Sequence, residues 1–401
     1  MKVQEIILRA IAKKITWLQA AQIIGISARQ MRRWLRRYEE HGYDGLFDRR
    51  CGKPSPKRVP LAQVEQILQL YQERYFDFNV KHFHEKLVAE HDIKLSYTFV
   101  KSALQGAGLV KKARKRRVHR KRRPRRPLPG MLLHIDASKH RWFQDTRFYD
   151  LIVILDDATS EIYYAQLVEE ESTRTVLAAL RAVIETKGIF CALYSDRASH
   201  FFYTPKGANK VDREQLTQVG RALKSLGIEM IAAYSPEARG RSERNFGTWQ
   251  GRLPQELRWR SITTVEAANE YLRTSYIKEF NERFTVKAEQ AGSAFTKVKG
   301  QDLALIFAIQ HERVVGRDNT VSLDKRVMQI EKGKWRSSLA GCRVTVYEHA
   351  DQSLSMRYGG NEVGRYDSAG KAIEKPGAQA AGKGRKRKGT HLGLNSATEG
   401  I

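Results

Sequence analysis

Cysteines, acidic residues and long apolar runs are all scarce in this sequence. Its three cysteines, Cys51, Cys191 and Cys342, are far apart and form no Cys-x-x-Cys pair. This spacing argues against a disulfide framework and against a cysteine zinc site, so we expect buried or idle thiols. The longest apolar run, 303–309, has only seven members. No predicted helix is therefore suited to cross a bilayer, and we expect no membrane partner.

Acidic side chains are too few to balance the basic ones. The 401 residues include 44 Asp and Glu against 72 Lys and Arg, which gives a net charge of +28. An excess of this size indicates a polyanionic partner, and nucleic acid is the first candidate. The first five residues carry charges where a signal peptide needs an apolar stretch, so we expect a cytoplasmic protein. The length predicts several domains, because single cores rarely grow beyond about 250–300 residues.

Much of the positive charge lies in residues 111–126, where 12 of 16 side chains are basic and none is acidic. The segment 369–401 adds a net charge of +5 and has little to pack. We predict that both segments are disordered when free. Neutralisation of DNA phosphates is the usual use of such charge density, and a solvated linker is the alternative. The predicted DNA contacts of this basic linker are Lys111, Lys112, Arg114, Lys115, Arg116, Arg117, Arg120, Lys121, Arg122 and Arg123.

Residues 17–38 have apolar side chains at helical spacing in two consecutive stretches. Gly25 suits the tight turn between them, and Ser27 is a good N-cap for the second helix. The pattern indicates a helix-turn-helix domain within residues 1–50, whose second helix enters a major groove of DNA. A plain helical hairpin with a solvated basic face is the alternative. The side chains expected to reach DNA from this helix are Arg29, Gln30, Arg32, Arg33, Arg36 and Arg37.

A second helical module is predicted over residues 61–110, after a linker at 51–60 that contains several prolines. We interpret it as a second helix-turn-helix-like domain that reads another part of the same DNA site. His82, His84 and His91 lie close together in this module, but no cysteine is near them. Ordinary imidazoles are therefore favoured over a zinc site.

Strands rich in β-branched residues alternate with helices after a basic linker at 111–130. This order predicts a mixed sheet covered by helices, an α/β domain over residues 131–295 whose ligands bind at strand ends. Strands are expected at 131–135, 149–155, 162–167, 190–194 and 229–234, and helices at 172–186 and 216–226.

Two aspartates, Asp136 and Asp196, follow separate strands of this predicted sheet. Converging carboxylates repel each other unless a cation lies between them, and Mg²⁺ prefers carboxylate and phosphate oxygens. Two such ions would activate water or a 3′-hydroxyl and stabilise the leaving oxygen of a phosphoryl transfer. Asp156 and Asp157 are rivals, but they fit a turn between strands better than a metal site.

A third carboxylate should complete the site, and Glu243 is our choice. It lies on the helix expected after Tyr234, between Arg241 and Arg244. We expect both arginines, together with Arg239, to reach DNA phosphates. The other glutamates weighed for the position are Glu229, Glu237 and Glu256. If none of these carboxylates binds a metal, the aspartates are turn residues and Glu243 is a solvated helix residue.

These motifs resemble those of DDE insertion-sequence transposases of the retroviral integrase superfamily, and within it the ISNCY type. The resemblance implies that Asp136, Asp196 and Glu243 are the DDE triad of an RNase H-like integrase catalytic core. It also implies a polynucleotidyl transferase that uses two Mg²⁺ ions, with Mn²⁺ as a substitute. The resemblance covers roughly residues 15–370 and rests on four segments, namely His134 to Ser138, Asp156 to Ser160, Tyr194 to Phe201 and Ser235 to Arg244.

Short alternating runs between residues 296 and 370 predict a small antiparallel β domain, followed by a basic tail at 371–401. Similar transposases have a barrel at this point, so the resemblance implies a small β-barrel that holds DNA or bridges subunits. A β module for assembly only is the alternative.

Together these patterns predict a multidomain DNA transposase that binds transposon inverted-repeat ends, cleaves them and transfers the strands to target DNA. Paired cuts at two ends imply at least a dimer on double-stranded DNA. The alternative is a DNA-binding regulator that retains an inactive integrase-like core. An RNase H-like nuclease for RNA or hybrids is disfavoured, because two modules suit duplex DNA.

Overall fold

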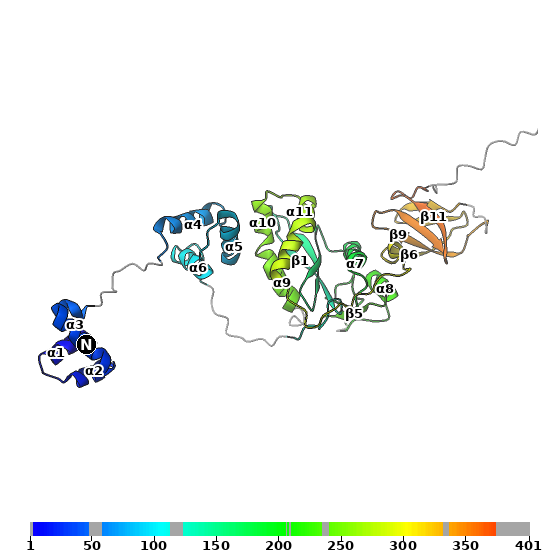
Figure 1. Cartoon of the computed structure of the whole chain (residues 1–401). Helices are drawn as coiled ribbons and strands as arrows, with labels where there is room; N and C mark the ends of the chain where they lie inside the picture. Colours follow the sequence, from blue (N-terminus) through cyan, green and yellow to red (C-terminus); the bar gives the residue numbers. More distant parts are fainter. Residues whose placement is uncertain are drawn as a thin grey trace, which may run out of the picture. The chain divides into compact units, whose positions relative to one another are not determined.

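The chain forms two compact units in a computed structural model that describes residues 3–47, 58–112, 123–205, 207, 210–234, 240–331 and 337–373. One unit comprises residues 1–73 and 99–109, and the other comprises 74–98 and 110–401. Figure 1 shows helices in the N-terminal part, a mixed α/β core, and a β region that follows it in the chain. Among the described residues, none of the helices combines the length and apolar character that a membrane crossing needs.

The helix-turn-helix prediction for the N-terminal domain is confirmed. Helix α1 (Val3–Ile11) precedes α2 (Trp17–Ile24) and α3 (Ala28–His41). Gly25 ends α2 with φ 74°, a left-handed conformation that costs glycine little. The Ser27 side chain accepts a hydrogen bond from the Gln30 N–H and so caps α3. Residues of all three helices, including Ile7, Ala20 and Met31, share one buried apolar cluster.

Helices occupy most of the described residues between this domain and the basic linker. A short 3-10 helix, η1 (Gly42–Leu46), follows α3. The expected second module contains α4 (Leu61–Glu73), α5 (Val80–His91) and α6 (Tyr97–Gly106).

The predicted mixed sheet is present, with strand order β3-β2-β1-β4-β5. The first three strands form an antiparallel meander, while β4 runs parallel to β1 and β5 runs parallel to β4. This arrangement requires a helical crossover before β4 and another before β5. The strands are β1 (Leu133–His140), β2 (Tyr149–Asp156), β3 (Ile162–Val168), β4 (Ala192–Ser195) and β5 (Glu229–Ala232), and the crossover helices are α7 (Thr173–Lys187) and α8 (Gln218–Ser225).

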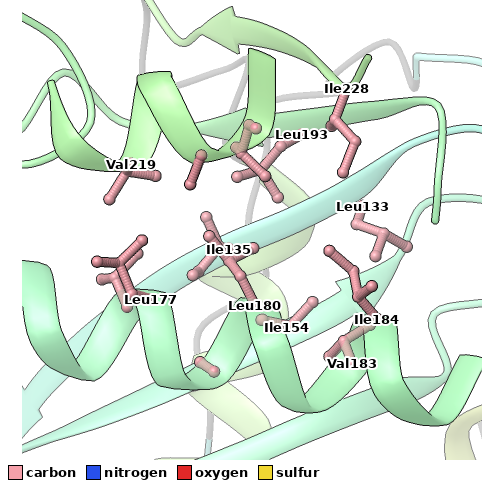
Figure 2. Close-up of a cluster of buried hydrophobic side chains, with 14 of the residues drawn as sticks. Leu133, Ile135, Ile154, Leu177, Leu180, Val183, Ile184, Leu193, Val219 and Ile228 are labelled. Carbon is pink, nitrogen blue, oxygen red and sulfur yellow. The ribbon is translucent and has the colours of Figure 1, made fainter. Parts of the chain in front are cut away.

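Apolar side chains cover both faces of this sheet. On one face, Ile135 and Leu193 meet Leu180 of α7 and Val219 of α8, as Figure 2 shows. On the other face, Val153 belongs to a cluster with the helices that follow β5. These helices are α9 (Gly240–Gln250), α10 (Leu253–Trp259), α11 (Val265–Tyr271), η3 (Leu272–Tyr276) and α12 (Ile277–Phe284). The sheet is therefore a buried middle layer.

One predicted strand end was wrong. We expected the first strand to stop at Asp136, but β1 continues to His140 and pairs with β2 along its whole length. The antiparallel partner stabilises these additional residues even though they are polar. On the other side, β4 ends at Ser195, so Asp136 lies where β1 loses its parallel neighbour.

The C-terminal region is an antiparallel β domain, but the predicted barrel was wrong. A four-stranded sheet has the order β11-β10-β9-β6, and β7 pairs with β8 in a second sheet. No closed barrel is found in the described part of residues 296–373, because the edge strands β11 and β6 do not pair with each other. The elements are α13 (Leu303–Ile306), β6 (Ile309–Val314), β7 (Thr320–Leu323), β8 (Arg326–Gln329), β9 (Arg343–Glu348), β10 (Leu354–Tyr358) and β11 (Asn361–Tyr366).

A buried polar cluster joins α5 to α10 within the second unit. The Glu256 carboxylate lies 2.7 Å from His82 Nε2 and 3.0 Å from Lys86 Nζ. Burial raises the pKa of Glu256, but the hydrogen bond from His82 and the charge of Lys86 outweigh this effect and lower it to about 2. Burial also lowers the pKa of His82, so its neutral ring donates to the carboxylate. The cluster stabilises contact between these helices when Glu256 is ionised.

Replacing Glu256 with glutamine should lower the free energy of unfolding by about 3 kcal/mol at pH 7. The folded pKa of about 2 lies below the ordinary 4.5, so the stabilisation is complete above pH 4.5 and is lost as the pH falls towards 2. Denaturant unfolding measured between pH 7 and pH 2 should show the free energies of unfolding of the wild type and Glu256→Gln converging as the pH falls. Glu266→Gln, an exposed change on α11, is the matched control. A deficit that is the same at every pH would contradict the assignment.

Candidate active site

Asp136 lies on β1, and Asp196 follows the end of the neighbouring parallel strand β4. The pairing of β1 with β4 aligns Leu133 with Leu193 and His134 with Tyr194. Two residues farther along, the same register sets Asp136 beside Asp196. Adjacent strands lie about 4.8 Å apart, so the two backbone positions are close enough for their carboxylates to share one cation.

Asp136 faces the side of the sheet where α9 packs. The rings of His134 and Tyr194 lie 5.1 Å apart, so these paired side chains project to one face. Side chains alternate along a strand, so Asp136 projects to that face too. Across β2, Asp136 is opposite Val153, which belongs to the cluster covered by α9 to α12. An extended chain through Asp196, just beyond the end of β4, would place its carboxylate on the same side.

The two carboxylates differ in exposure. Asp136 is buried, at 8% exposed, whereas Asp196 is half-buried just after the end of β4. The Ala198 N–H donates to Asp196 Oδ1 at 3.0 Å, which holds the carboxylate in a turn at the strand end. Asp136 is therefore held by the sheet, and Asp196 is held by a solvent-exposed turn.

Glu243 lies in the first turn of α9 and is exposed. It shares a helix face with Gln250, seven residues later, and Gln250 Nε2 donates to Ser138 Oγ at 2.9 Å. Ser138 projects from β1 on the same side as Asp136, so this face of α9 is turned towards the strand with the aspartate. No group of three or more His, Cys, Asp or Glu side chains lies close enough to hold a metal ion in the described residues. The structure therefore aligns the two aspartates but does not gather Glu243 into a cluster with them.

The other glutamates considered for the third position lie away from the aspartates or outside the described residues. Glu229 begins β5, at the opposite end of that strand from the edge where Asp196 lies. Glu256 is buried against His82 and Lys86. Glu237 lies outside the described residues. Of the described candidates, only Glu243 is on α9, which packs on the face of the sheet that Asp136 occupies.

Asp156 ends β2 and Asp157 begins the turn after it, which agrees with the turn interpretation, and both are fully buried. Asp156 accepts hydrogen bonds from the Gly130 and Thr159 N–H groups at 2.9 and 2.8 Å. Asp157 accepts from His134 Nε2 at 2.7 Å, and burial followed by nearby arginine charges lowers the pKa of His134 to about 3. His134 is therefore neutral at pH 7 and serves as a donor to Asp157.

The three histidines of the second helical module bind separate partners. His82 binds Glu256, His84 Nε2 lies 2.8 Å from the Leu95 carbonyl oxygen, and His91 Nε2 lies 3.1 Å from the Tyr75 hydroxyl. Each imidazole therefore takes part in a hydrogen bond with a different partner.

The predicted DNA contacts fall into three groups. Arg29, Gln30, Arg32, Arg33, Arg36 and Arg37 are all exposed on α3, and Lys111, Lys112 and Arg244 are exposed elsewhere. Arg123 and Arg241 bind Asp157 within the protein, so their contact with DNA stays a prediction. The remaining contacts lie outside the described residues, namely Arg114, Lys115, Arg116, Arg117, Arg120, Lys121, Arg122 and Arg239.

Sequence comparisons give this arrangement a context. A helix-turn-helix domain family matches residues 4–55, and a homeodomain-like domain family matches residues 30–104. The protein y4bF of Sinorhizobium fredii, whose name describes it as a transposase, is 30% identical over 362 residues, covering 90% of this chain and 79% of that protein. This chain belongs to the insertion-sequence transposase family. The two domain matches at its N-terminus indicate DNA binding.

A second relative of this transposase is the transposase for insertion sequence IS1202 of Streptococcus pneumoniae. It is 30% identical over 367 residues, which cover 82% of this chain and 78% of that protein. Among solved structures, the HTLV-2 integrase catalytic core domain in complex with magnesium is similar at 16% identity and a TM-score of 0.27. That match covers 37% of the transposase and 90% of the integrase chain.

Proposed function

We propose that this transposase cleaves transposon ends and transfers the strands with Asp136, Asp196 and Glu243 as its DDE triad. The observation that supports the proposal is the register of β1 and β4, which, continued by two residues, brings Asp136 level with Asp196. Glu243 is proposed as the third member because it lies on α9, which packs on the face of the sheet that Asp136 occupies. Gln250, on the same side of α9 as Glu243, donates to Ser138 of β1.

The residues fit a magnesium site by their chemistry. Carboxylate oxygens are the ligands that Mg²⁺ prefers, and aligned aspartates repel each other without a cation. We propose that these three carboxylates bind two Mg²⁺ ions, with Mn²⁺ as a substitute. Ions bound there would activate water or a 3′-hydroxyl and stabilise the leaving oxygen of the phosphodiester.

The exposed side chains of α3 are proposed to read and hold the transposon ends. Arginine and glutamine side chains can bind base edges in a major groove, and arginines of α3 that do not reach a base would contact phosphates. The basic linker then neutralises phosphates along the duplex without reading sequence. Two ends must be cut for one transposition event, so we propose that at least two copies act together on DNA.

Incubation with duplex DNA from either side of the transposase gene tests this function. We expect Mg²⁺-dependent nicks at inverted-repeat ends and no nicks in the presence of a chelator. Tight end binding without cleavage in Mg²⁺ or Mn²⁺ would favour a regulator with an inactive core. A preference for an RNA–DNA hybrid in competition with duplex ends would favour a nuclease instead.

A further inference from the structure

One buried carboxylate, that of Asp157, gathers groups from three parts of the chain. Its side chain is 1% exposed, and its Oδ1 atom lies 2.7 Å from both His134 Nε2 and Arg123 Nη2. Arg241 Nη1 also donates to Oδ1, and the Arg126 N–H donates to Oδ2 at 2.8 Å. Strand β1, the end of the basic linker and the first turn of α9 therefore meet at this side chain.

Further hydrogen bonds join the linker directly to its neighbours. Arg241 Nη2 donates to the carbonyl oxygens of Arg123 and Pro124 at 2.9 and 3.0 Å. Arg125 Nη1 donates to the carbonyl oxygen of Asp157 at 2.9 Å and to Ser160 Oγ at 2.8 Å. The linker residues 123–126 are thus fastened to both the turn after β2 and α9.

The charges make Asp157 essential to this junction. Arg241 is only 16% exposed, and a buried guanidinium needs an anion beside it. Arg123 brings a second positive charge to the same carboxylate. Burial, and then the charges of Arg123 and Arg125, lower the pKa of Arg241 to about 10. Without the negative charge of Asp157, the two arginines would repel each other and the first turn of α9 would lose its anchor.

We propose that Asp157 is a positioning residue that fixes the first turn of α9, and with it Glu243, against the end of the basic linker. Glu243 lies two residues after Arg241, so movement of this anchor moves the third carboxylate. The basic linker and the first turn of α9 are then joined through the two ion pairs that Asp157 forms with Arg123 and Arg241. This inference rests on the proposed function, because it gives Glu243 its role as a metal ligand.

Asp157→Asn keeps the shape of the side chain and removes its charge, and Asp156→Asn is the matched control. Asp156 is equally buried in the same turn, but its described partners are Gly130 and Thr159 rather than α9. Hydrogen exchange measured by mass spectrometry should show at least about tenfold faster exchange at residues 241–248 in Asp157→Asn only. Arg241→Gln should produce the same change, and the double variant should add nothing further.

Cleavage kinetics provide the second measurement. In Asp157→Asn we expect the Mg²⁺ concentration for half-maximal cleavage to rise at least about fivefold, with affinity for transposon ends unchanged within about twofold. Equal exchange at residues 241–248 in the two asparagine variants would overturn the inference, because Asp157 would then only stabilise its turn. A wild-type protein without Mg²⁺-dependent cleavage would instead refute the proposed function, and the exchange result would still decide whether Asp157 anchors α9.

Discussion

Replacing Asp136 or Asp196 with asparagine is expected to lower cleavage at transposon ends by at least about 10³-fold. Metal ligands of this kind contribute several kcal/mol of charge stabilisation in the transition state, and each 1.4 kcal/mol is about tenfold in rate. Binding to the ends should persist and should tighten slightly, because an asparagine beside a phosphate removes a carboxylate repulsion. Single-turnover cleavage and fluorescence anisotropy measure the two quantities separately.

Glu243→Gln should reproduce this loss, and Glu229→Gln should not. Glu229 is an exposed carboxylate at the far end of β5, so the glutamine removes a comparable charge away from the aspartate pair. If both glutamine variants lost cleavage equally, the effect would come from overall charge and the assignment of Glu243 would be wrong. Loss of end binding together with cleavage in the aspartate variants would also count against the assigned site.

Neutralising the seven Lys and Arg residues within 113–122 is expected to reduce the salt dependence of DNA binding. Each phosphate contact contributes about 0.9 to the slope of log affinity against log salt, so seven contacts give a reduction of up to about 6. Residues 123–126 are left unchanged in this variant because Arg123 and Arg125 hold the turn after β2. Affinity measured between low and moderate salt gives the slope.

A charge-preserving variant is the control for this change. Converting the five arginines within 113–122 to lysine keeps every positive charge, and the slope should stay at its wild-type value. If the neutralised variant also kept the wild-type slope, the segment would be a spacer between domains and not a DNA contact.

Features encoded by neighbouring residues could be predicted from the sequence. The left-handed turn at Gly25 and the cap at Ser27 follow from local backbone and side-chain chemistry. The strands of the core follow from alternating or continuous apolar runs. The alignment of Asp136 with Asp196 also follows once both are placed near the edge of one sheet, although β1 extends farther than its apolar residues indicate.

Features that depend on distant pairing could not be predicted. Barrel closure requires the first and last strands to pair, and alternation along each strand carries no information about that partner. The junction at Asp157 joins residues 84 positions apart, from Asp157 to Arg241, so the sequence showed only an acidic pair after a strand. The docking of α5 on α10 through Glu256 is equally remote from any local pattern.

Iron-mediated cleavage of the protein backbone tests the proposed metal site most directly. Fe²⁺ that replaces Mg²⁺, with ascorbate and peroxide, generates radicals that cut the chain beside its ligands. We predict cuts near Asp136, Asp196 and Glu243 in the wild-type transposase on transposon-end DNA, suppressed by excess Mg²⁺ and absent from Asp136→Asn. Cuts elsewhere, or cuts near these residues that persist unchanged in Asp136→Asn, would contradict the assignment of the site.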